Sequence, residues 1–426
     1  MKSGEDWRAL LSMTSGSKDK APAPQKCLAN VMTALKHCPE WSGVLRYNDF
    51  TNALEVAKAL PKAKSQTETI DSGEWQELYA LYAIAWLQER LGFEISVKLM
   101  DQVAELIGGE SRYHPVRTWL GALRWDGKPR CGRMLADIFG ARDDAVNAAV
   151  GSMWMISAVA RVMSPGCQAD HMMVLEGAQG TGKSTALRVL VGGEPWFQNS
   201  PIEMGNKDAL ISMRGCWVYE FDELDSFRGR DATRVKSFIT QPVDTYRPVF
   251  GVRKRSFPRQ VVFVGSTNEK QYLPDQTGNR RFWPVACGVI DVARLERERE
   301  QLWAEAYQRY CGGEAWHITD ATLLGQVEES QAEREQPDPW QGPIEKWWHE
   351  LMPYRQLEGV TTADVFRAID LSLSRAERKE EMRAGACLRR MGLDRHRVGT
   401  RPRLYKYLPP PEWNIGRTCG GTEEPE

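Results

Sequence analysis

Apolar and polar positions follow two different periodicities along the chain. Between residues 74 and 91, apolar side chains recur at steps of three and four residues, which predicts an amphipathic helix. Residues 115–130 predict a second helix that ends in an Asp-Gly turn, and residues 145–162 predict a long apolar helix. We therefore expect a helical N-terminal domain over residues 26–164.

Short apolar runs then replace the helical repeat. These runs are residues 172–175 (MMVL), 216–221 (CWVYEF), 261–264 (VVFV) and 282–285 (FWPV). Strands that alternate with helical stretches predict a parallel sheet with helices on both faces, which is an α/β fold. A charged helical stretch over residues 291–335 follows, so we place the boundaries of this domain at residues 165 and 335.

A Pro-rich stretch, QPDPWQGP at residues 336–343, predicts a linker to a further module. Helix signals follow at residues 344–351, 361–369 and 375–391, and a basic hairpin is expected over 393–408. Three helices and a hairpin predict a winged-helix-like module over residues 344–410. Residues 1–25, rich in Ser, Lys, Gly and Pro, and residues 411–426 are expected to be flexible.

Composition agrees with a chain of about two or three domains. It has 426 residues, of which 42% are hydrophobic and 27% charged. No apolar run approaches the roughly 20 residues needed to span a bilayer, and the N-terminus has no secretory pattern. Nine cysteines, an odd number without a CxxC pair, argue against a disulfide framework or a zinc ribbon. We therefore expect a reduced, cytoplasmic protein without a membrane partner.

The formal net charge of −1 indicates no particular partner, but the distribution of charged residues along the chain is informative. Residues 383–406 contain eight Lys or Arg against one acid, and residues 246–259 contain five and no acid. Such local positive fields suit a polyanion.

The strongest chemical signal is GAQGTGKS at residues 177–184, which fits G-x-x-x-x-G-K-[ST] at every fixed position. It lies between an expected strand and an expected helix, as a phosphate-binding loop requires. Lys183 is predicted to reach the β- and γ-phosphates of ATP, and Ser184 to bind Mg²⁺. The predicted nucleotide contacts are Gly177, Gly180, Thr181, Gly182, Lys183, Ser184 and Thr185.

Carboxylates follow the strand at residues 216–221. Hydrolysis of ATP needs one acid near Mg²⁺ and one that acts on water. We assign Asp222 to the metal and Glu223 to water, with Glu220 as a competitor for either role. The alternative is an acidic, solvated helix start.

Two further polar signals follow the strand at residues 261–264. Asn268 is predicted to sense the γ-phosphate or the attacking water, although Asn is also common in turns. Arg280 and Arg281 precede the last strand. One of them, donated by a neighbouring subunit, is expected to stabilise charge on the phosphoryl group; the alternative is a surface arginine paired with nearby acids.

Basic residues mark two predicted nucleic-acid contacts. A hairpin with its tip at residues 249–252 combines aromatic and basic side chains, which suits a nucleic-acid backbone with some base stacking; the alternative is a charged edge strand. The predicted contacts are Arg247, Arg253, Lys254 and Arg255 in the hairpin, and Arg389, Arg390, Arg401 and Arg403 in the C-terminal module.

In this order the motifs resemble the virulence-associated E family of phages, prophages and pathogenicity islands. The matching phrases are RYNDF (46–50), YHPVRTWLGALRWDGKPR (113–130), PGCQADHMMVLEGAQGTGKST (165–185), YEFDELDSF (219–227), DTYRPVFG (244–251) and GSTNEKQYLPDQTGNRRFWPV (265–285). The resemblance implies an AAA+ type P-loop ATPase core related to superfamily 3 helicases, assembled as a homo-hexamer in a bacterial host. It also places the two acids of the strand motif at Glu220 and Glu223, and the hairpin in a DNA-gripping role.

Together these signals predict an ATP-dependent DNA helicase or translocase that acts on single-stranded and origin DNA in replication of a mobile element, with a replication primase or polymerase as a possible partner. Priming by the chain itself is not expected, because residues 1–165 look too helical. An ATP-switched origin-binding or loader protein would carry the same motifs. A small-molecule kinase is a third hypothesis, against which the basic hairpin argues.

Overall fold

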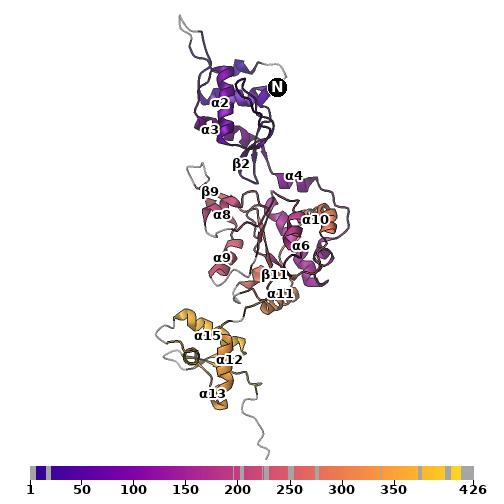
Figure 1. Ribbon diagram of the computed structural model, residues 1–426, viewed down its shortest axis with the longest axis vertical. Coiled ribbons are helices and arrows are strands. Elements are labelled where there is room, and N and C mark those ends of the chain that lie inside the picture. The colour runs from indigo at the N-terminus through magenta and orange to yellow at the C-terminus, as the bar shows by residue number, and fades with distance from the viewer. Residues whose placement is uncertain are drawn as a thin grey trace, which may run out of the picture. The chain divides into compact units, whose positions relative to one another are not determined.

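The computed structural model describes residues 6–15, 21–194, 196–201, 206–222, 224, 230–247, 254–273, 278–336, 338–372, 377–398 and 404–413. The chain divides into two compact units, Met1–Glu335 and Gln336–Glu426. Figure 1 shows the helices and strands of each unit. The larger unit contains an N-terminal part with its own hydrophobic core and a parallel sheet with a second and a third core.

The N-terminal part packs three helices on a four-stranded sheet of order β3-β2-β1-β4. The helices are α1 (Leu28–His37), α2 (Glu77–Leu91) and α3 (Val97–Glu110), and short 3-10 turns lie at Trp7–Leu10 and Pro39–Trp41. The strands are β1 (Leu45–Asn48), β2 (Ala53–Val56), β3 (Gly73–Glu74) and β4 (Arg112–Tyr113). Trp41, Leu45, Trp86 and Val103 are buried together in its core.

The structure therefore corrects the expectation of a purely helical domain over residues 26–164. Four short strands lie among the helices, and residues 115–163 pack into the same core as the parallel sheet. These later residues form α4 (Pro115–Ala122), a 3-10 turn at Cys131–Arg133, α5 (Met134–Asp137) and α6 (Ala145–Met163). The strands have only two to four residues, too few for a period-two pattern to be recognised.

The central sheet has the order β11-β5-β10-β7-β6, and every neighbouring pair is parallel. Its strands are β5 (Met172–Glu176), β6 (Phe197–Gln198), β7 (Val218–Phe221), β10 (Val262–Thr267) and β11 (Phe282–Ala286). The predicted parallel α/β sheet is confirmed. Strands β5, β7 and β10 are almost wholly buried, as expected for a sheet covered on both faces.

Helices α6 and α10 (Val292–Cys311) lie on one side of the sheet and α8 (Lys207–Ser212) and α9 (Arg230–Ile239) on the other (Figure 1), and side-chain alternation divides the strands between two cores. Met173 and Leu175 of β5 face a core shared with α6, α7 (Lys183–Leu190) and α10, whereas Met172 and Val174 face the core that contains α9. The remaining elements of this unit are the antiparallel pair β8 (Val243–Tyr246) and β9 (Arg255–Pro258), a 3-10 turn at Asn279–Arg281, and α11 (Ala321–Glu333).

The smaller unit has four helices and a two-stranded antiparallel sheet in its described residues. They are α12 (Gln341–Glu350), α13 (Pro353–Glu358), α14 (Thr362–Ala368), α15 (Arg378–Arg390), β12 (Asp394–Val398) and β13 (Leu404–Leu408). Ile344, Trp348, Val365 and Leu388 are buried in a core of their own. A bidentate ion pair between Arg383 and Asp338, with a closest distance of 2.7 Å, ties α15 to the start of this unit.

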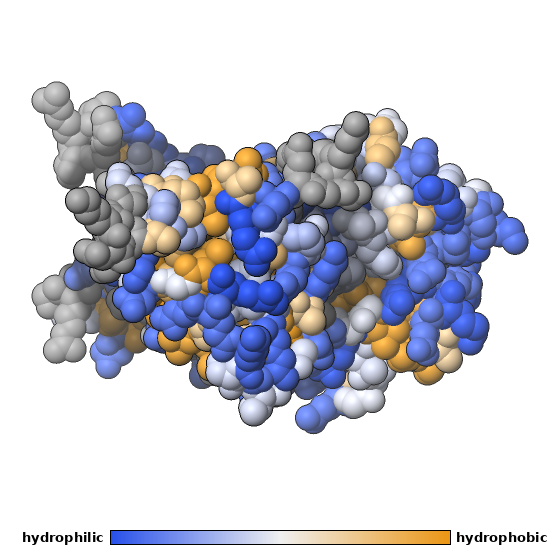
Figure 2. Space-filling view, turned by 90° about the horizontal axis from the view of Figure 1, so that it is seen from above, coloured by the Kyte–Doolittle hydropathy of each residue, from blue (hydrophilic) through white to orange (hydrophobic). Residues whose placement is uncertain are grey.

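Hydrophilic side chains cover most of the face shown in Figure 2, and hydrophobic ones form smaller patches between them. Among the described residues, α6 is the one helix long and apolar enough to cross a membrane. Trp154, Ile156 and Val159 of this helix are fully buried, so it serves as a core helix of the larger unit.

Candidate functional site

The candidate site lies where the chain reverses its direction of winding through the parallel sheet. The crossover from β5 leads past β10 and β7 to β6, whereas the crossover from β10 leads back past β5 to β11. Ligands of open α/β sheets bind at such a switch point, outside the carboxyl ends of the strands. The loop after β5 and the residues after β10 therefore meet at the place where a ligand is expected.

The loop after β5 turns sharply because glycines take backbone angles that other residues avoid. Gly180 has φ of 80° and Gly182, directly before α7, has φ of 90°. A side chain at either position would be strained. The loop thereby delivers Lys183 and Ser184 as the first residues of α7.

Lys183 is a buried cation that has no carboxylate partner among the described residues. Its Nζ donates to the carbonyl oxygens of Gly177 at 2.6 Å and Ala178 at 3.0 Å, and to Oδ1 of Asn268 at 3.3 Å. The side chain belongs to a residue that is only 8% exposed. Because these three acceptors are neutral, the positive charge remains available for an anion that enters the loop.

Ser184 joins the loop to the neighbouring strand β7. Its hydroxyl donates to Oε1 of Glu220 at 2.8 Å. Glu220 has no solvent exposure, and within the described part of the chain its Oε2 has no hydrogen-bond partner. Burial raises the pKa of this carboxyl, and the hydrogen bond from Ser184 opposes that rise. A buried carboxylate oxygen that accepts no hydrogen bond is chemically suited to bind a cation.

The other predicted acids take different positions. Asp222 is exposed at the end of β7 and accepts a hydrogen bond from the Ser266 hydroxyl at 3.0 Å. The structure thus sets Glu220, and not Asp222, against the predicted metal-binding hydroxyl of Ser184. Glu223 lies outside the described residues.

One hollow collects most of the predicted nucleotide contacts. Its lining consists of Gln179, Gly180, Thr181, Gly182, Lys183, Ser184, Thr185, Asp222, Ser266, Thr267 and Asn268. Gly177 borders the same loop through its carbonyl. The sequence motif, one acid and the predicted sensor amide are therefore brought together by three adjacent strands, β5, β10 and β7.

Arg280 and Arg281 lie at the amino-terminal ends of the parallel strands, whereas the glycine loop lies at their carboxyl-terminal ends. The two arginines form the 3-10 turn that leads into β11, whose first residue, Phe282, pairs with Met172 at the start of β5. The glycine loop follows the far end of β5, roughly 15 Å away for a strand of this length. Neither arginine lines the hollow, so the two do not complete the site of their own chain.

A partly buried ion pair beside the loop was not anticipated from the sequence. Glu176, the last residue of β5, accepts from Nε of Arg334 at 2.6 Å and from its Nη2 at 3.0 Å, and from the Tyr272 hydroxyl at 2.9 Å. Burial together with the neighbouring Glu176 carboxylate raises the pKa of Tyr272 well above its usual value. An acid at a buried strand end is a signal in the sequence, but nothing there indicates a partner 158 residues later.

The predicted basic hairpin is present as the pair β8 and β9, in which Tyr246 pairs with Arg255. The rings of Tyr246 and Phe257 stack at 4.6 Å between centroids, with an interplanar angle of 25°. Arg247, Lys254 and Arg255 are exposed, whereas Arg253 and the predicted tip at residues 249–252 lie outside the described residues. At the base of the pair, Arg259 and Asp244 form a buried ion pair at 2.5 Å.

In the smaller unit, Arg389 and Arg390 lie in the last turn of α15. Arg401 and Arg403 fall outside the described residues. Strand β12 is exposed along its whole length, and Arg395 lies over the ring of Tyr405 at 3.7 Å.

A comparison with family models assigns the chain to a family. The model of the virulence-associated protein E-like domain matches residues 120–337, just over half of the chain. The chain therefore belongs to the virulence-associated protein E-like family, and the resemblance seen in the motifs is confirmed. No curated protein matches the chain.

Solved structures show a weaker likeness. An apo structure of the NrS-1 C-terminal region is 11% identical, with 88% of this chain and 99% of that chain covered and a TM-score of 0.46. An A form apo structure of the same region is 13% identical, with 68% and 78% covered and a TM-score of 0.37. Scores this low transfer no function.

Proposed function

We propose that the chain is an ATP-dependent DNA helicase or translocase with an AAA+ type P-loop core, which acts in replication of a phage, prophage or satellite element. The observation that carries this proposal is the convergence of Lys183, Ser184, Glu220 and Asn268 at one switch point of the parallel sheet. Membership of the virulence-associated protein E-like family supports the same reading.

The residues present fit ATP with Mg²⁺. The buried ammonium of Lys183, which donates to three neutral oxygens within the described residues, suits the β- and γ-phosphates. The Ser184 hydroxyl and the unpartnered Oε2 of Glu220 are oxygen donors of the kind that Mg²⁺ prefers, and Asp222 borders the same hollow. Bound Mg²⁺ would neutralise charge on the phosphate oxygens.

The roles of the polar side chains follow from their positions. Asn268 would hold its amide against the γ-phosphate or the attacking water, because its Oδ1 already contacts the lysine that faces them. Glu220, Asp222 and Glu223 would divide the metal and the water between them, with Glu220 nearest the metal because it already contacts Ser184.

A ring of identical subunits, most simply a hexamer, would complete each site. Arg280 and Arg281 lie at the amino-terminal ends of the strands, and the hollow of the same chain lies at the carboxyl-terminal ends. A phosphate of bound ATP could therefore contact these arginines only across a subunit boundary. An arginine supplied in this way stabilises charge on the transferring phosphoryl group.

Single-stranded DNA would run along the basic hairpin, held by Arg247, Lys254 and Arg255 and by Arg253 beyond the described residues. The smaller unit would act as a winged-helix-like reader of origin DNA through Arg389, Arg390, Arg401 and Arg403. We place this activity in the bacterial cytoplasm, next to a primase or polymerase of the same replication system.

The test compares ATP turnover, strand displacement and native mass for the wild type and Lys183→Ala. The wild type should hydrolyse ATP, form a ring with ATP and single-stranded DNA, and release the strand of a forked duplex. Lys183→Ala should lose turnover while its far-UV circular dichroism stays unchanged. Turnover near the wild-type rate in this variant would remove the glycine loop from the mechanism. ATPase activity and DNA binding without strand release would favour the origin-binding or loader alternative.

A further inference from the structure

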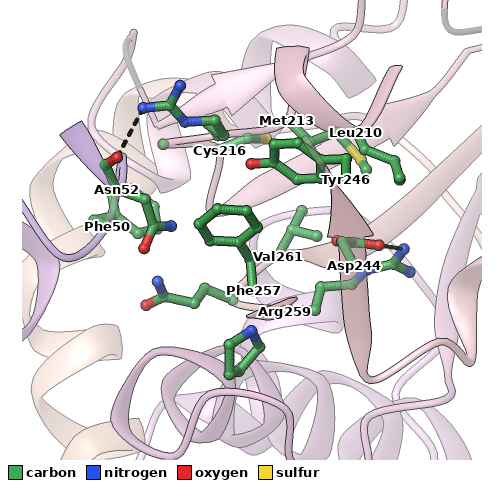
Figure 3. Close-up of a pocket in the computed structure, with 14 residues that line it drawn as sticks. Phe50, Asn52, Leu210, Met213, Cys216, Asp244, Tyr246, Phe257, Arg259 and Val261 are labelled. Atoms are coloured by element: carbon green, nitrogen blue, oxygen red, sulfur yellow. Dashed lines mark hydrogen bonds and ion pairs between the residues drawn. The ribbon is translucent and has the colours of Figure 1, made fainter. Parts of the chain in front are cut away.

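A second hollow lies beneath the basic hairpin, at the meeting point of three segments that are distant in sequence. It is bordered by Phe50 and Asn52 from the turn between β1 and β2, by Met213 just after α8, and by Tyr246 and Phe257 from the hairpin (Figure 3). No residue of the hollow next to the glycine loop takes part in it.

Its walls combine aromatic and apolar side chains with polar ones in about equal measure. Tyr246 is 4% exposed and Phe257 is partly exposed, and the two rings stack on each other. Leu210 and Met213 lie next to Tyr246 (Figure 3). A flat aromatic ligand could therefore replace water against Phe257 with a gain in buried apolar surface.

Two polar groups at this hollow have no partner in the described part of the chain. The hydroxyl of Tyr246 is buried and accepts or donates no hydrogen bond, and it points toward the side where Phe50 and Asn52 lie (Figure 3). The side-chain amide of Asn52 also makes no hydrogen bond within the described residues. A buried hydroxyl without a partner is rare and costly, so it calls for an explanation.

The turn that carries Asn52 is held rigidly in place. Arg214 donates from Nε to the Thr51 carbonyl at 2.5 Å and from Nη2 to the Asn52 carbonyl at 3.1 Å, as Figure 3 shows for Asn52. The Gln260 amide donates to the Asp49 carbonyl at 2.9 Å. Asn52 has φ of 52°, in the left-handed region that Asn tolerates better than most residues.

The charge around the opening is positive. Arg255 of β9 and the preceding Lys254 are exposed, and Asp244, the one acid among the described residues that border the hollow, is paired with Arg259. An aromatic ring with a hydrogen-bonding edge, attached to a negatively charged backbone, matches all three properties.

We propose that the mouth of this hollow binds one unstacked base of a single-stranded nucleic acid, with Phe257 against the ring and the Tyr246 hydroxyl and Asn52 amide at its polar edge. The space inside, about 40 Å³, admits the edge of a base and not the whole ring. This inference rests on the proposed action on DNA and adds a base-contacting site shared between the hairpin and the N-terminal sheet. The strand would then be held by its phosphates at the hairpin and by one base at the hollow.

The test compares two oligonucleotides of equal length, one of thymidines and one in which the central residues are abasic, so that the phosphates are the same. Wild-type protein should bind the thymidine strand roughly 5- to 100-fold more tightly, as expected for one stacked base. Tyr246→Phe and Asn52→Gly should each reduce this ratio by about two- to tenfold, the value of one hydrogen bond. Glycine is used at residue 52 because it accepts the left-handed backbone.

The tested substitution is not expected to unfold the protein, so a change in the binding ratio reports on binding. Tyr246→Phe removes a hydroxyl that has no partner in the described chain, so its melting temperature should be equal to or above that of the wild type. Tyr354→Phe, at an exposed tyrosine of the smaller unit, is the matched control and should leave the ratio unchanged. Arg255→Ala should weaken the binding of both oligonucleotides by the same factor.

Equal binding of the two oligonucleotides by the wild type, or an unchanged ratio in Tyr246→Phe, would overturn the base site and leave the proposed function standing. Failure of the wild type to bind either strand would overturn the proposed function together with this inference.

Discussion

Glu220 is a carboxyl group without solvent contact, and its burial decides what a substitution there does. Its pKa is raised in the folded state, so above the unfolded pKa the ionised carboxylate costs stability that a neutral side chain would not cost. Glu220→Gln keeps an acceptor for Ser184. We expect ATP turnover to fall by roughly 100-fold, as for loss of one preorganised charge-stabilising group, with the melting temperature unchanged or higher.

The control for this substitution is Glu305→Gln, at a second buried glutamate of the same unit. Glu305 accepts from the backbone nitrogens of Arg130 and Cys131 and from Arg309, so its charge is fully compensated. This variant should lose stability and keep its turnover per folded molecule. A destabilised Glu220→Gln with normal turnover would show that Glu220 is structural.

His171 should make the larger unit sensitive to acid. Burial lowers its pKa from 6.5 to about 4, and the ring stacks on Trp283 at 4.1 Å. On acidification the unfolded chain therefore takes up a proton at His171 at a higher pH than the folded chain does. The free energy of unfolding has its full value above pH 6.5 and falls by about 1 to 3 kcal/mol as the pH drops from 6.5 toward 4. Denaturant unfolding between pH 4 and 7 should show a shallower decline for His171→Phe. An equal slope in both proteins would contradict the assignment, and His396→Phe, at an exposed site, is the control.

Among the elements, the hairpin β8–β9 offers the clearest test of nucleic-acid contact. Replacing Arg253, Lys254 and Arg255 with Ala should weaken single-stranded DNA binding and flatten the plot of log affinity against log salt by about 0.7 to 1 unit for each lost phosphate contact. The ion pair of Arg259 with Asp244 at the base of the hairpin stays in place, so the fold should persist. Unchanged binding and slope would mean that the charges serve only to protect an edge strand.

Elements built from strong local patterns were predictable, and those defined by tertiary contacts were not. The short runs that form β5, β7, β10 and β11 are largely apolar on both faces, which is typical of strands in a covered parallel sheet. The strands β1 to β4 could not be recognised, because each is very short and its pairing depends on helices elsewhere in the chain. The N-terminal expectation was wrong for this reason.

The site shows the same division. The glycine loop follows from the sequence, because its residues are adjacent and their spacing reflects backbone geometry. Which acid contacts Ser184 depends on the register between β7 and α7, and the sequence left Glu220 and Asp222 as competitors. The hollow beneath the hairpin joins Asn52 to Tyr246 across nearly 200 residues, and no local pattern could reveal it.

At the scale of the whole molecule, the position of Arg280 and Arg281 makes a mixing experiment decisive. A working site would need an intact loop from one subunit and intact arginines from its neighbour, because the loop and the arginines of one chain lie at opposite ends of the parallel strands. Lys183→Ala and the double variant Arg280→Ala/Arg281→Ala should each be inactive alone. If subunits mix at random, roughly one quarter of the interfaces in a 1:1 mixture would pair an intact loop with intact arginines, so turnover should recover to about that fraction.

The matched control mixes Lys183→Ala with Glu220→Gln, since both changes damage the same face of the subunit. In that mixture every subunit carries a defect at its own glycine loop or at the carboxylate beside it, so no interface contains an intact nucleotide site. Recovery in the first mixture and none in the second would be the signature of sites shared between neighbours. If the arginine variant hydrolyses ATP at the wild-type rate, or if the first mixture stays inactive although native mass shows mixed rings, each subunit works alone and the ring proposal fails.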